Sequence, residues 1–290
     1  MFEQSTQETK EKIRKRLSGI GNLPSIPHII TEVSQLLDSD KTSASDLCRV
    51  ISKDQAIAAK ILSVANSPLY GLPRRVATID FAIVIIGFEH IRNILLALSL
   101  VESFTVRNTK EWNHKNYWAH SLITATAAKR IADDLHYPKS GEVFTVGLLH
   151  DLGLVVLQKY MNTEYKQIIE LVKKENYSFY YAEQMVLGYT HEDIAEYLLE
   201  RWNFPQSIID SVLFHHHPSL SDKNPVLASL IHLVDYMTQK LSIGHFHCDD
   251  GYLFDENIID ILGFGNEEYI NQFIMSYEEL FKSQFESLKR

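Results

Sequence analysis

Apolar residues recur at intervals of three and four along most of the chain, whereas the strict alternation typical of strands is scarce. One such segment, residues 24–37, places six apolar side chains on one face of an amphipathic helix: Ile26, Ile29, Ile30, Val33, Leu36 and Leu37. A longer one, residues 111–136, shows the same period. The hydrophobic pattern therefore predicts an all-α protein.

Polar residues predict where several helices begin. Ser43 and Asp46 form a capping box, because each side chain can bond a backbone N–H group that the first helical turn leaves free. Thr190 and Asp193 repeat this pattern later in the chain. Single N-cap residues are expected at two further positions, Asp54 and Asn224.

The most apolar region, residues 81–101, is interrupted by four polar or charged residues: Glu89, His90, Arg92 and Asn93. With Gly87 as a hinge, it predicts two core helices over residues 79–86 and 89–104 and no membrane span. The segment from Met1 to Arg16 is polar and of mixed charge, unlike a signal peptide. We therefore expect a soluble protein without a membrane partner.

Composition narrows the class of protein. With 290 residues and 45% hydrophobic content, the chain can bury one large core or two closely packed ones. A net charge of -9 argues against broad binding to nucleic acid or to an anionic membrane. The two cysteines, Cys48 and Cys248, are far apart and match no metal-binding spacing. They indicate free thiols in a reducing compartment, so we expect a cytoplasmic location.

An adjacent imidazole and carboxylate, His150 and Asp151, interrupt the apolar segment between residues 140 and 160, which we expect to form one helix. Such groups are costly in a core unless something pairs with them. Gly147 and Gly153 flank the pair, and each glycine in a helix interior costs about 1 kcal/mol relative to alanine. These costs predict that a metal, a ligand or another backbone comes close here. The alternative is a hydrogen-bonded His–Asp pair that serves only the core.

Several further histidines and one further aspartate fall on predicted helices or helix ends. Each has a structural alternative, such as a core histidine or a histidine that complements a helix dipole. Together, imidazoles and carboxylates form a donor set that suits manganese, iron or zinc better than calcium. One or two bound ions would generate a hydroxide for phosphoester cleavage, with Asp151 as the natural bridge. In chain order the candidate ligands are His120, His150, Asp151, His191, His215, His216 and Asp235.

This order resembles the HD superfamily of metal-dependent phosphohydrolases. The resemblance implies two metal sites, and Asp151 would be the catalytic residue of a hydrolase. It assigns the first metal to His120, His150, Asp151 and Asp235, and the second to His191, His215 and His216 with Asp151 bridging.

A closer resemblance, to HDOD domains, covers residues 20–242. It rests on L-P-S-I-P at 23–27, I-S-K-D at 51–54, A-N-S-P-L-Y-G at 65–71 and the stretch from His191 to H-H-H-P at 215–218. It implies an N-terminal helical subdomain (20–108) packed on an HD-like subdomain (109–242). A helix over 1–19 would precede them, and a helical extension over 243–290 would follow. The resemblance also implies bacterial signalling or regulation, through signalling proteins or a small nucleotide-like ligand.

At several positions the chain has a different residue from relatives that hydrolyse cyclic di-GMP. Leu154 replaces a lysine that holds phosphate, and Asn116 replaces a glutamate ligand found in some of them. After the paired histidines the chain has His217 in place of a glutamate, and no Gly-Tyr-Pro motif follows. We therefore expect a regulatory HDOD protein with a metal-binding pocket. The alternative is a metal-dependent phosphohydrolase acting on a nucleotide or cyclic nucleotide.

Overall fold

The structure is a computed structural model that describes residues 2–20, 32, 36, 42–104, 106–249, 251 and 253–289. Secondary structure in these ranges is helical, with no strands, which confirms the all-α prediction. The helix predicted over residues 24–37 and the motif at 23–27 lie outside the described residues, apart from Glu32 and Leu36.

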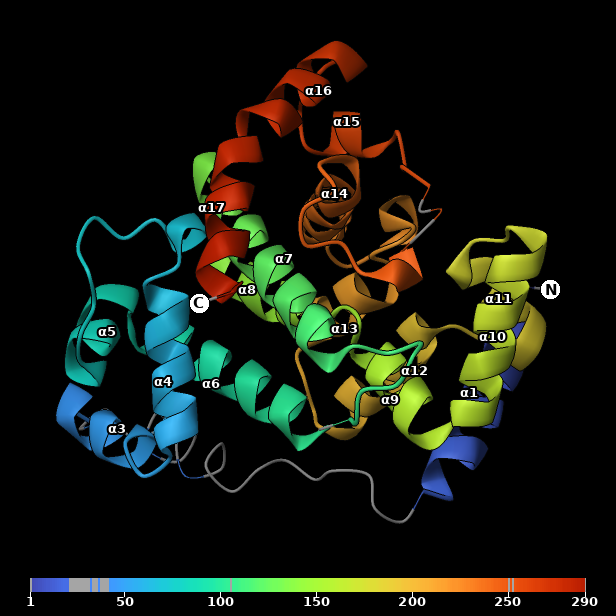
Figure 1. Ribbon diagram of the computed structural model, residues 1–290, viewed down its shortest axis with the longest axis horizontal. Helices are drawn as coiled ribbons and strands as arrows, with labels where there is room; N and C mark the ends of the chain where they lie inside the picture. Colours follow the sequence, from blue (N-terminus) through green and yellow to red (C-terminus); the bar gives the residue numbers. More distant parts are fainter. Residues whose placement is uncertain are drawn as a thin grey trace.

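The first part of the chain contributes a group of short helices at the left of Figure 1. They are α3 (Ala44–Ile51), α4 (Gln55–Ala65), η1 (Pro68–Tyr70), α5 (Ile79–Ile86) and α6 (Phe88–Ser103). Helix α1 (Phe2–Ser18) does not join this group. It lies across the molecule, where it packs against a helix from the second half of the chain, α12 (His191–Arg201).

The middle of the chain forms the body of the molecule around α7 (His114–Asp134), which packs along α8 (Ser140–Leu149). Helix α6 packs on the same α8 and so joins the two parts of the fold. The remaining helices of the body are α9 (Leu152–Tyr160), α10 (Asn162–Glu175), α11 (Phe179–Leu187), α13 (Gln206–Leu213), η2 (Pro218–Leu220) and α14 (Pro225–Lys240).

The end of the chain returns to the first part of the fold. After η3 (His247–Asp249), α15 (Ile258–Ile261) and α16 (Glu267–Ser276), helix α17 (Glu278–Lys289) runs back along α7 to η1. On α17, Gln284 is fully buried and its Oε1 accepts a hydrogen bond from Leu69 N at 3.3 Å. Just before α17, the Tyr277 hydroxyl donates to Asp134 Oδ2 at 2.5 Å. The C-terminal helix therefore connects η1 with α7.

The predicted caps and the predicted hinge are confirmed. Both capping boxes form, at the starts of α3 and α12, and Asp54 and Asn224 cap α4 and α14. Gly87, with φ of 91°, separates α5 from α6.

One prediction is wrong: residues 140–160 do not form one continuous helix. The chain turns at His150 and Asp151, so that α8 ends at Leu149 and α9 begins at Leu152. Asp151, with φ of -95° and ψ of 15°, has left the helical region, and the His150 ring bonds back to Gly147 O at 2.8 Å. Among the described residues, this 21-residue apolar segment is long enough to cross a membrane, but 94% of its apolar 18-residue window is buried inside the fold.

Candidate metal centre

The fold brings all seven predicted ligands into one cluster. His120 comes from α7, His150 and Asp151 from the turn between α8 and α9, and Asp235 from α14. His191 is the first residue of α12, while the two remaining ligands, His215 and His216, follow the end of α13. Six of the seven side chains are buried, and only His216 is partly exposed.

The two glycines beside the His–Asp pair allow other backbones to approach. A Cβ atom on Gly147 would lie 2.7 Å from the Cα of Ala125 on α7. On Gly153 it would lie 1.9 Å from the carbonyl oxygen of His191, at the start of α12. The prediction of a close approach is therefore confirmed for neighbouring backbone. Both contacts hold ligand-bearing helices against the His150–Asp151 turn.

The first group of donor atoms consists of His120, His150 and Asp235, whose donor atoms lie within 4.8 Å of one another. His120 Nε2 is 3.1 Å from His150 Nε2 and 3.4 Å from Asp235 Oδ1. Asp151 Oδ2 faces the same group, at 3.5 Å from His120 Nε2 and 3.4 Å from His150 Nε2.

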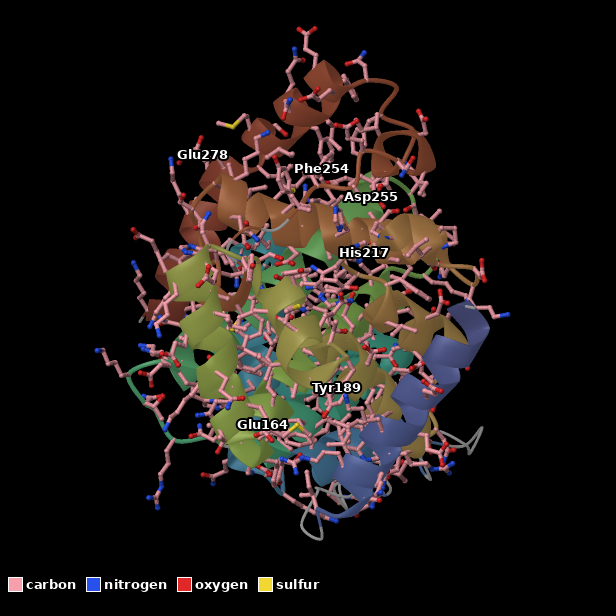
Figure 2. All side chains as sticks on the ribbon, turned by 90° about the vertical axis from the view of Figure 1, so that its right-hand side faces the viewer. Glu164, Tyr189, His217, Phe254, Asp255 and Glu278 are labelled. Atoms are coloured by element: carbon pink, nitrogen blue, oxygen red, sulfur yellow. The ribbon has the colours of Figure 1, made fainter. Side chains whose placement is uncertain are left out.

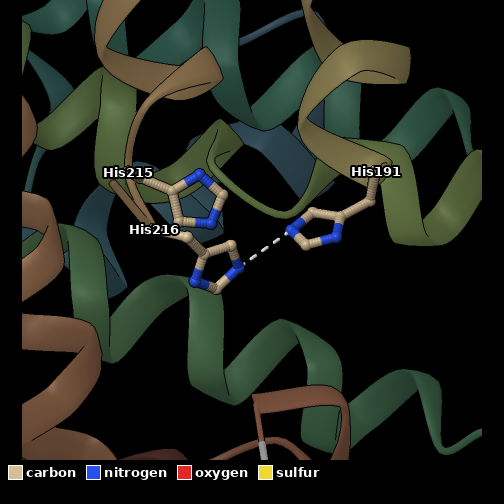
Figure 3. Close-up of side chains that lie close together, drawn as sticks. All are labelled: His191, His215 and His216. Carbon is tan, nitrogen blue, oxygen red and sulfur yellow. Dashed lines mark hydrogen bonds between the residues drawn. The ribbon is translucent and has the colours of Figure 1, made fainter. Parts of the chain in front are cut away.

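The second group consists of His191, His215 and His216 (Figure 3). His191 Nε2 is 3.2 Å from His216 Nε2. The other carboxylate oxygen of Asp151, Oδ1, lies 3.6 Å from His191 Nε2 and 3.8 Å from His215 Nε2. The two oxygens of Asp151 therefore face different groups, which is the geometry of a bridging ligand.

Four of the imidazoles are oriented by a hydrogen bond at Nδ1. With Nδ1 donating its proton to an acceptor, the lone pair of Nε2 points into the cluster and is available to a metal. The acceptors are Gly244 O for His120 (3.0 Å), Gly147 O for His150 (2.8 Å), Val212 O for His215 (2.7 Å) and Glu183 Oε2 for His191 (2.7 Å).

Two carboxylates in the cluster lack ordinary hydrogen-bond partners. No oxygen of Asp151 or Asp235 accepts a hydrogen bond from the described residues, although both side chains are fully buried. Burial raises the pKa of each carboxyl group. Burial also lowers the pKa of His120 to about 4 and that of His150 to about 3, which keeps these imidazoles neutral. Neutral imidazoles beside unsatisfied carboxylates fit a divalent cation, which would compensate the buried negative charge.

Three residues around the cluster were not predicted as part of it. Glu183 of α11 accepts from both Nδ1 and the backbone N of His191. Glu192 accepts from His216 N at 3.1 Å, and burial raises its pKa to about 8. His232 of α14 bonds through Nδ1 to His215 O at 2.8 Å. The only sequence signal for His232 is its position one helical turn before Asp235.

Glu183 and His191 form a buried hydrogen-bonded pair. Burial alone would lower the pKa of His191, but the charge and hydrogen bond of Glu183, together with the charges of Asp151 and Glu192, raise this pKa to about 10. Burial raises the pKa of Glu183 itself. A metal that binds His191 Nε2 therefore meets an imidazole oriented by a carboxylate.

The charged groups that most strongly affect the seven described ligands are themselves His, Asp and Glu side chains. The principal charged neighbours that shift the ligands' pKa values are His, Asp and Glu residues, with no Lys or Arg among them. Leu154 is fully buried in the core, and Asn116 is exposed on α7.

Comparison with known families agrees with this geometry. The family model of the HDOD domain matches residues 23–218, about two thirds of the chain. The chain belongs to the HDOD family. A curated relative, an uncharacterized protein of Treponema pallidum (strain Nichols), is 24% identical over 204 residues. That match covers 68% of this chain but only 38% of the relative's length.

Solved structures share the fold of this HDOD protein. An HDOD domain protein of unknown function from Geobacter sulfurreducens is 24% identical, with a TM-score of 0.69, over 94% of this chain and 98% of its own. A structure from Marinobacter aquaeolei VT8 named "Putative signal transduction protein" is 21% identical, with a TM-score of 0.73. The match covers 99% of this chain and 66% of the Marinobacter chain. A structure from Shewanella amazonensis SB2B named "Putative phosphohydrolase" is 20% identical, with a TM-score of 0.70. The match covers 94% of this chain and 97% of the Shewanella chain. At these identities the likeness is one of fold.

Proposed function

We propose that this HDOD protein is a regulatory module of bacterial signalling whose buried centre binds one or two ions of iron, manganese or zinc. The observation that carries the proposal is a cluster of possible metal donors whose pKa values, in the described residues, are shifted mainly by His, Asp and Glu and by no Lys or Arg. The donor set supports metal binding. The missing positive charge favours a role in binding partner proteins or a small ligand over hydrolysis of a phosphate ester.

The residues divide naturally between two ions. His120, His150 and Asp235 would hold the first, and the second would be held by the group of three histidines His191, His215 and His216. Asp151 would bridge them, since its two oxygens face different groups. Bound ions of this kind act as Lewis acids and lower the pKa of coordinated water.

The alternative function is a metal-dependent phosphohydrolase acting on a nucleotide or cyclic nucleotide. The same donor set favours this function. Two structures of similar fold from Shewanella amazonensis SB2B, named "Putative phosphohydrolase" and "Putative metal-dependent phosphohydrolase", agree with it. Such an enzyme would depend on its metals alone for charge stabilisation. The name "Putative signal transduction protein" of the Marinobacter structure agrees instead with the regulatory role.

Elemental analysis tests the metal centre directly. Protein purified without added metal, or loaded afterwards with iron, manganese or zinc, should contain about one or two equivalents. His150→Ala and Asp151→Ala should lose them. His217→Ala is the matched control, because His217 directly follows the ligand His216 in the sequence but belongs to none of the donor groups. A wild-type protein that stays metal-free after loading would refute the proposal.

Turnover assays then separate the two functions. The metal-loaded protein is incubated with a panel of cyclic dinucleotides and mononucleotides, and product release is measured. We expect no turnover. Hydrolysis that disappears in Asp151→Ala but persists in His217→Ala would establish the phosphohydrolase instead.

A further inference from the structure

The segment between α14 and α15 contacts the candidate metal centre. We call residues 244–249, 251 and 253–255 of this segment the connector. It follows the region matched by the HDOD family model, which ends at residue 218. The connector leads into α15, α16 and α17 and so joins the centre to the C-terminal helices.

The near end of the connector is attached to a ligand of the first metal group. Gly244 O accepts the hydrogen bond from His120 Nδ1 at 3.0 Å. The Phe246 ring then stacks on the His120 ring, with centroids 6.4 Å apart and an interplanar angle of 30°. One residue later, His247 Nε2 lies 3.0 Å from the hydroxyl of Tyr165 on α10. The backbone and side chains of this end therefore hold His120 from two directions.

The far end is attached to a ligand of the second metal group through His232. Asp255 N donates to His232 Nε2 at 2.8 Å, and the opposite ring nitrogen, Nδ1, bonds to His215 O at 2.8 Å. Asp255 Oδ2 also accepts from Ser219 N at 3.2 Å. Figure 2 shows Phe254 and Asp255 in the same region of the molecule as His217, which follows the two histidine ligands in the sequence. His232 is thus a bridge between a ligand's backbone and the connector.

We infer that metal binding at the centre and docking of the connector are thermodynamically coupled. An ion fixes the orientations of His120 and of the His215 turn, and these are the groups that hold the two ends. Such coupling is reciprocal: if metal stabilises the docked connector, the docked connector tightens metal binding by the same factor. The inference rests on the proposed metal centre. It adds that occupancy of the centre controls how firmly the C-terminal helices are attached.

Hydrogen exchange of the full-length wild-type protein tests whether bound metal stabilises the docked connector. Peptides covering the connector are compared between chelator-treated protein and protein loaded with zinc or manganese. We expect exchange in both end segments to slow by about tenfold on metal loading. Helix α5, on the far side of the molecule, serves as an internal reference that should not change.

A matched pair of substitutions tests whether the docked connector in turn tightens metal binding. Asp255→Pro removes the N–H group that donates to His232, whereas Asp255→Ala keeps it. Both variants lose the side-chain bonds from Ser219 and Asn257, so the pair differs in the bond to His232. Asp255 is partly exposed, so neither change disturbs the core. We expect Asp255→Pro to release zinc to a chelator about tenfold faster than wild type, and Asp255→Ala to release it at the wild-type rate.

The outcomes separate this inference from the proposed function. Metal that binds without slowing exchange at either end, or equal release rates in all three proteins, would overturn the coupling and leave the metal centre standing. Failure of the wild-type protein to bind any metal would overturn both. Slower exchange at both ends together with faster release in Asp255→Pro alone would support the coupling.

Discussion

An imidazole of the candidate centre can bind a metal only if the lone pair of one ring nitrogen faces into the cluster. The bonds at Nδ1 determine that orientation, and three of the four acceptors are backbone carbonyls: Gly244, Gly147 and Val212. The fourth acceptor is the Glu183 side chain, which makes His191 the one ligand of these four whose Nδ1 bonds to a charged group.

Gly153→Ala should destabilise the protein, because the new Cβ would lie 1.9 Å from the carbonyl oxygen of His191. We expect a loss of at least about 2 kcal/mol in the free energy of unfolding, measured by urea denaturation. Gly19→Ala is the control, since its Cβ would meet only ordinary contacts at 3.5 Å and beyond. Equal stability of the two variants would contradict the close approach of α12.

Metal binding should release protons, and the apparent affinity should rise with pH. His191, with its pKa raised to about 10, carries a proton at neutral pH that a metal must displace. Raising the pH from about 6 to 9 reduces that competition, so binding should tighten. Calorimetry in buffers of different ionisation enthalpy counts the protons. The Glu183→Gln variant should release fewer protons on binding metal, because the substitution removes a negative charge that raises the pKa of His191. A metal affinity that did not depend on pH would count against a protonated His191 as a ligand.

At the scale of elements, the start of α12 positions a ligand. The helix begins at His191 because the Thr190–Asp193 capping box ends the preceding loop there. Glu183 and Gly153 then contact the same residue from α11 and α9. A local capping motif thus helps to position a side chain of the candidate metal centre.

Thr190→Ala should weaken metal binding as well as stability. Loss of the cap costs about 1 kcal/mol, and displacement of His191 should reduce affinity at the second metal group by about tenfold. Ser43→Ala removes the equivalent cap from α3. It should cost similar stability and leave metal affinity, measured by chelator competition, unchanged. If both variants bound metal like the wild type, the cap would have only a structural role.

At the scale of the whole molecule, the C-terminal helix joins parts that are distant in sequence. Gln284 of α17 bonds the backbone of Leu69 in η1, and the neighbouring Phe281 is fully buried. Helix α1 makes a second long-range contact, packing on α12 in the second half of the chain. Both ends of the chain are thus packed against the body that carries the centre.

Gln284→Ala should lower the free energy of unfolding by about 1–3 kcal/mol, because Leu69 N would lose its acceptor in a buried setting. Gln272→Ala, an exposed glutamine on α16, is the control and should change little. Thermal unfolding followed by circular dichroism measures both. A Gln284 variant as stable as the control would mean that α17 contributes little to holding η1.

The sequence alone was sufficient for features that depend on neighbours within a few residues. The helical period, both capping boxes and the hinge at Gly87 follow from local sterics and hydrogen bonding, and all are confirmed. Candidate ligands could also be named, because imidazoles and carboxylates in apolar helices are costly without a common partner. The structure brings all seven side chains into one cluster, and their binding of a metal stays a prediction.

Only the tertiary structure decided which groups surround the ligands. The period of residues 140–160 predicted an unbroken helix, but the turn at Asp151 is what points its two oxygens at different histidine groups. Glu183 meets His191 across a helix boundary, and His232 meets Asp255 across 23 positions. Sequence periodicity carries no information about such pairs, because their geometry depends on how separate helices pack. The connector over His120 is likewise a product of packing.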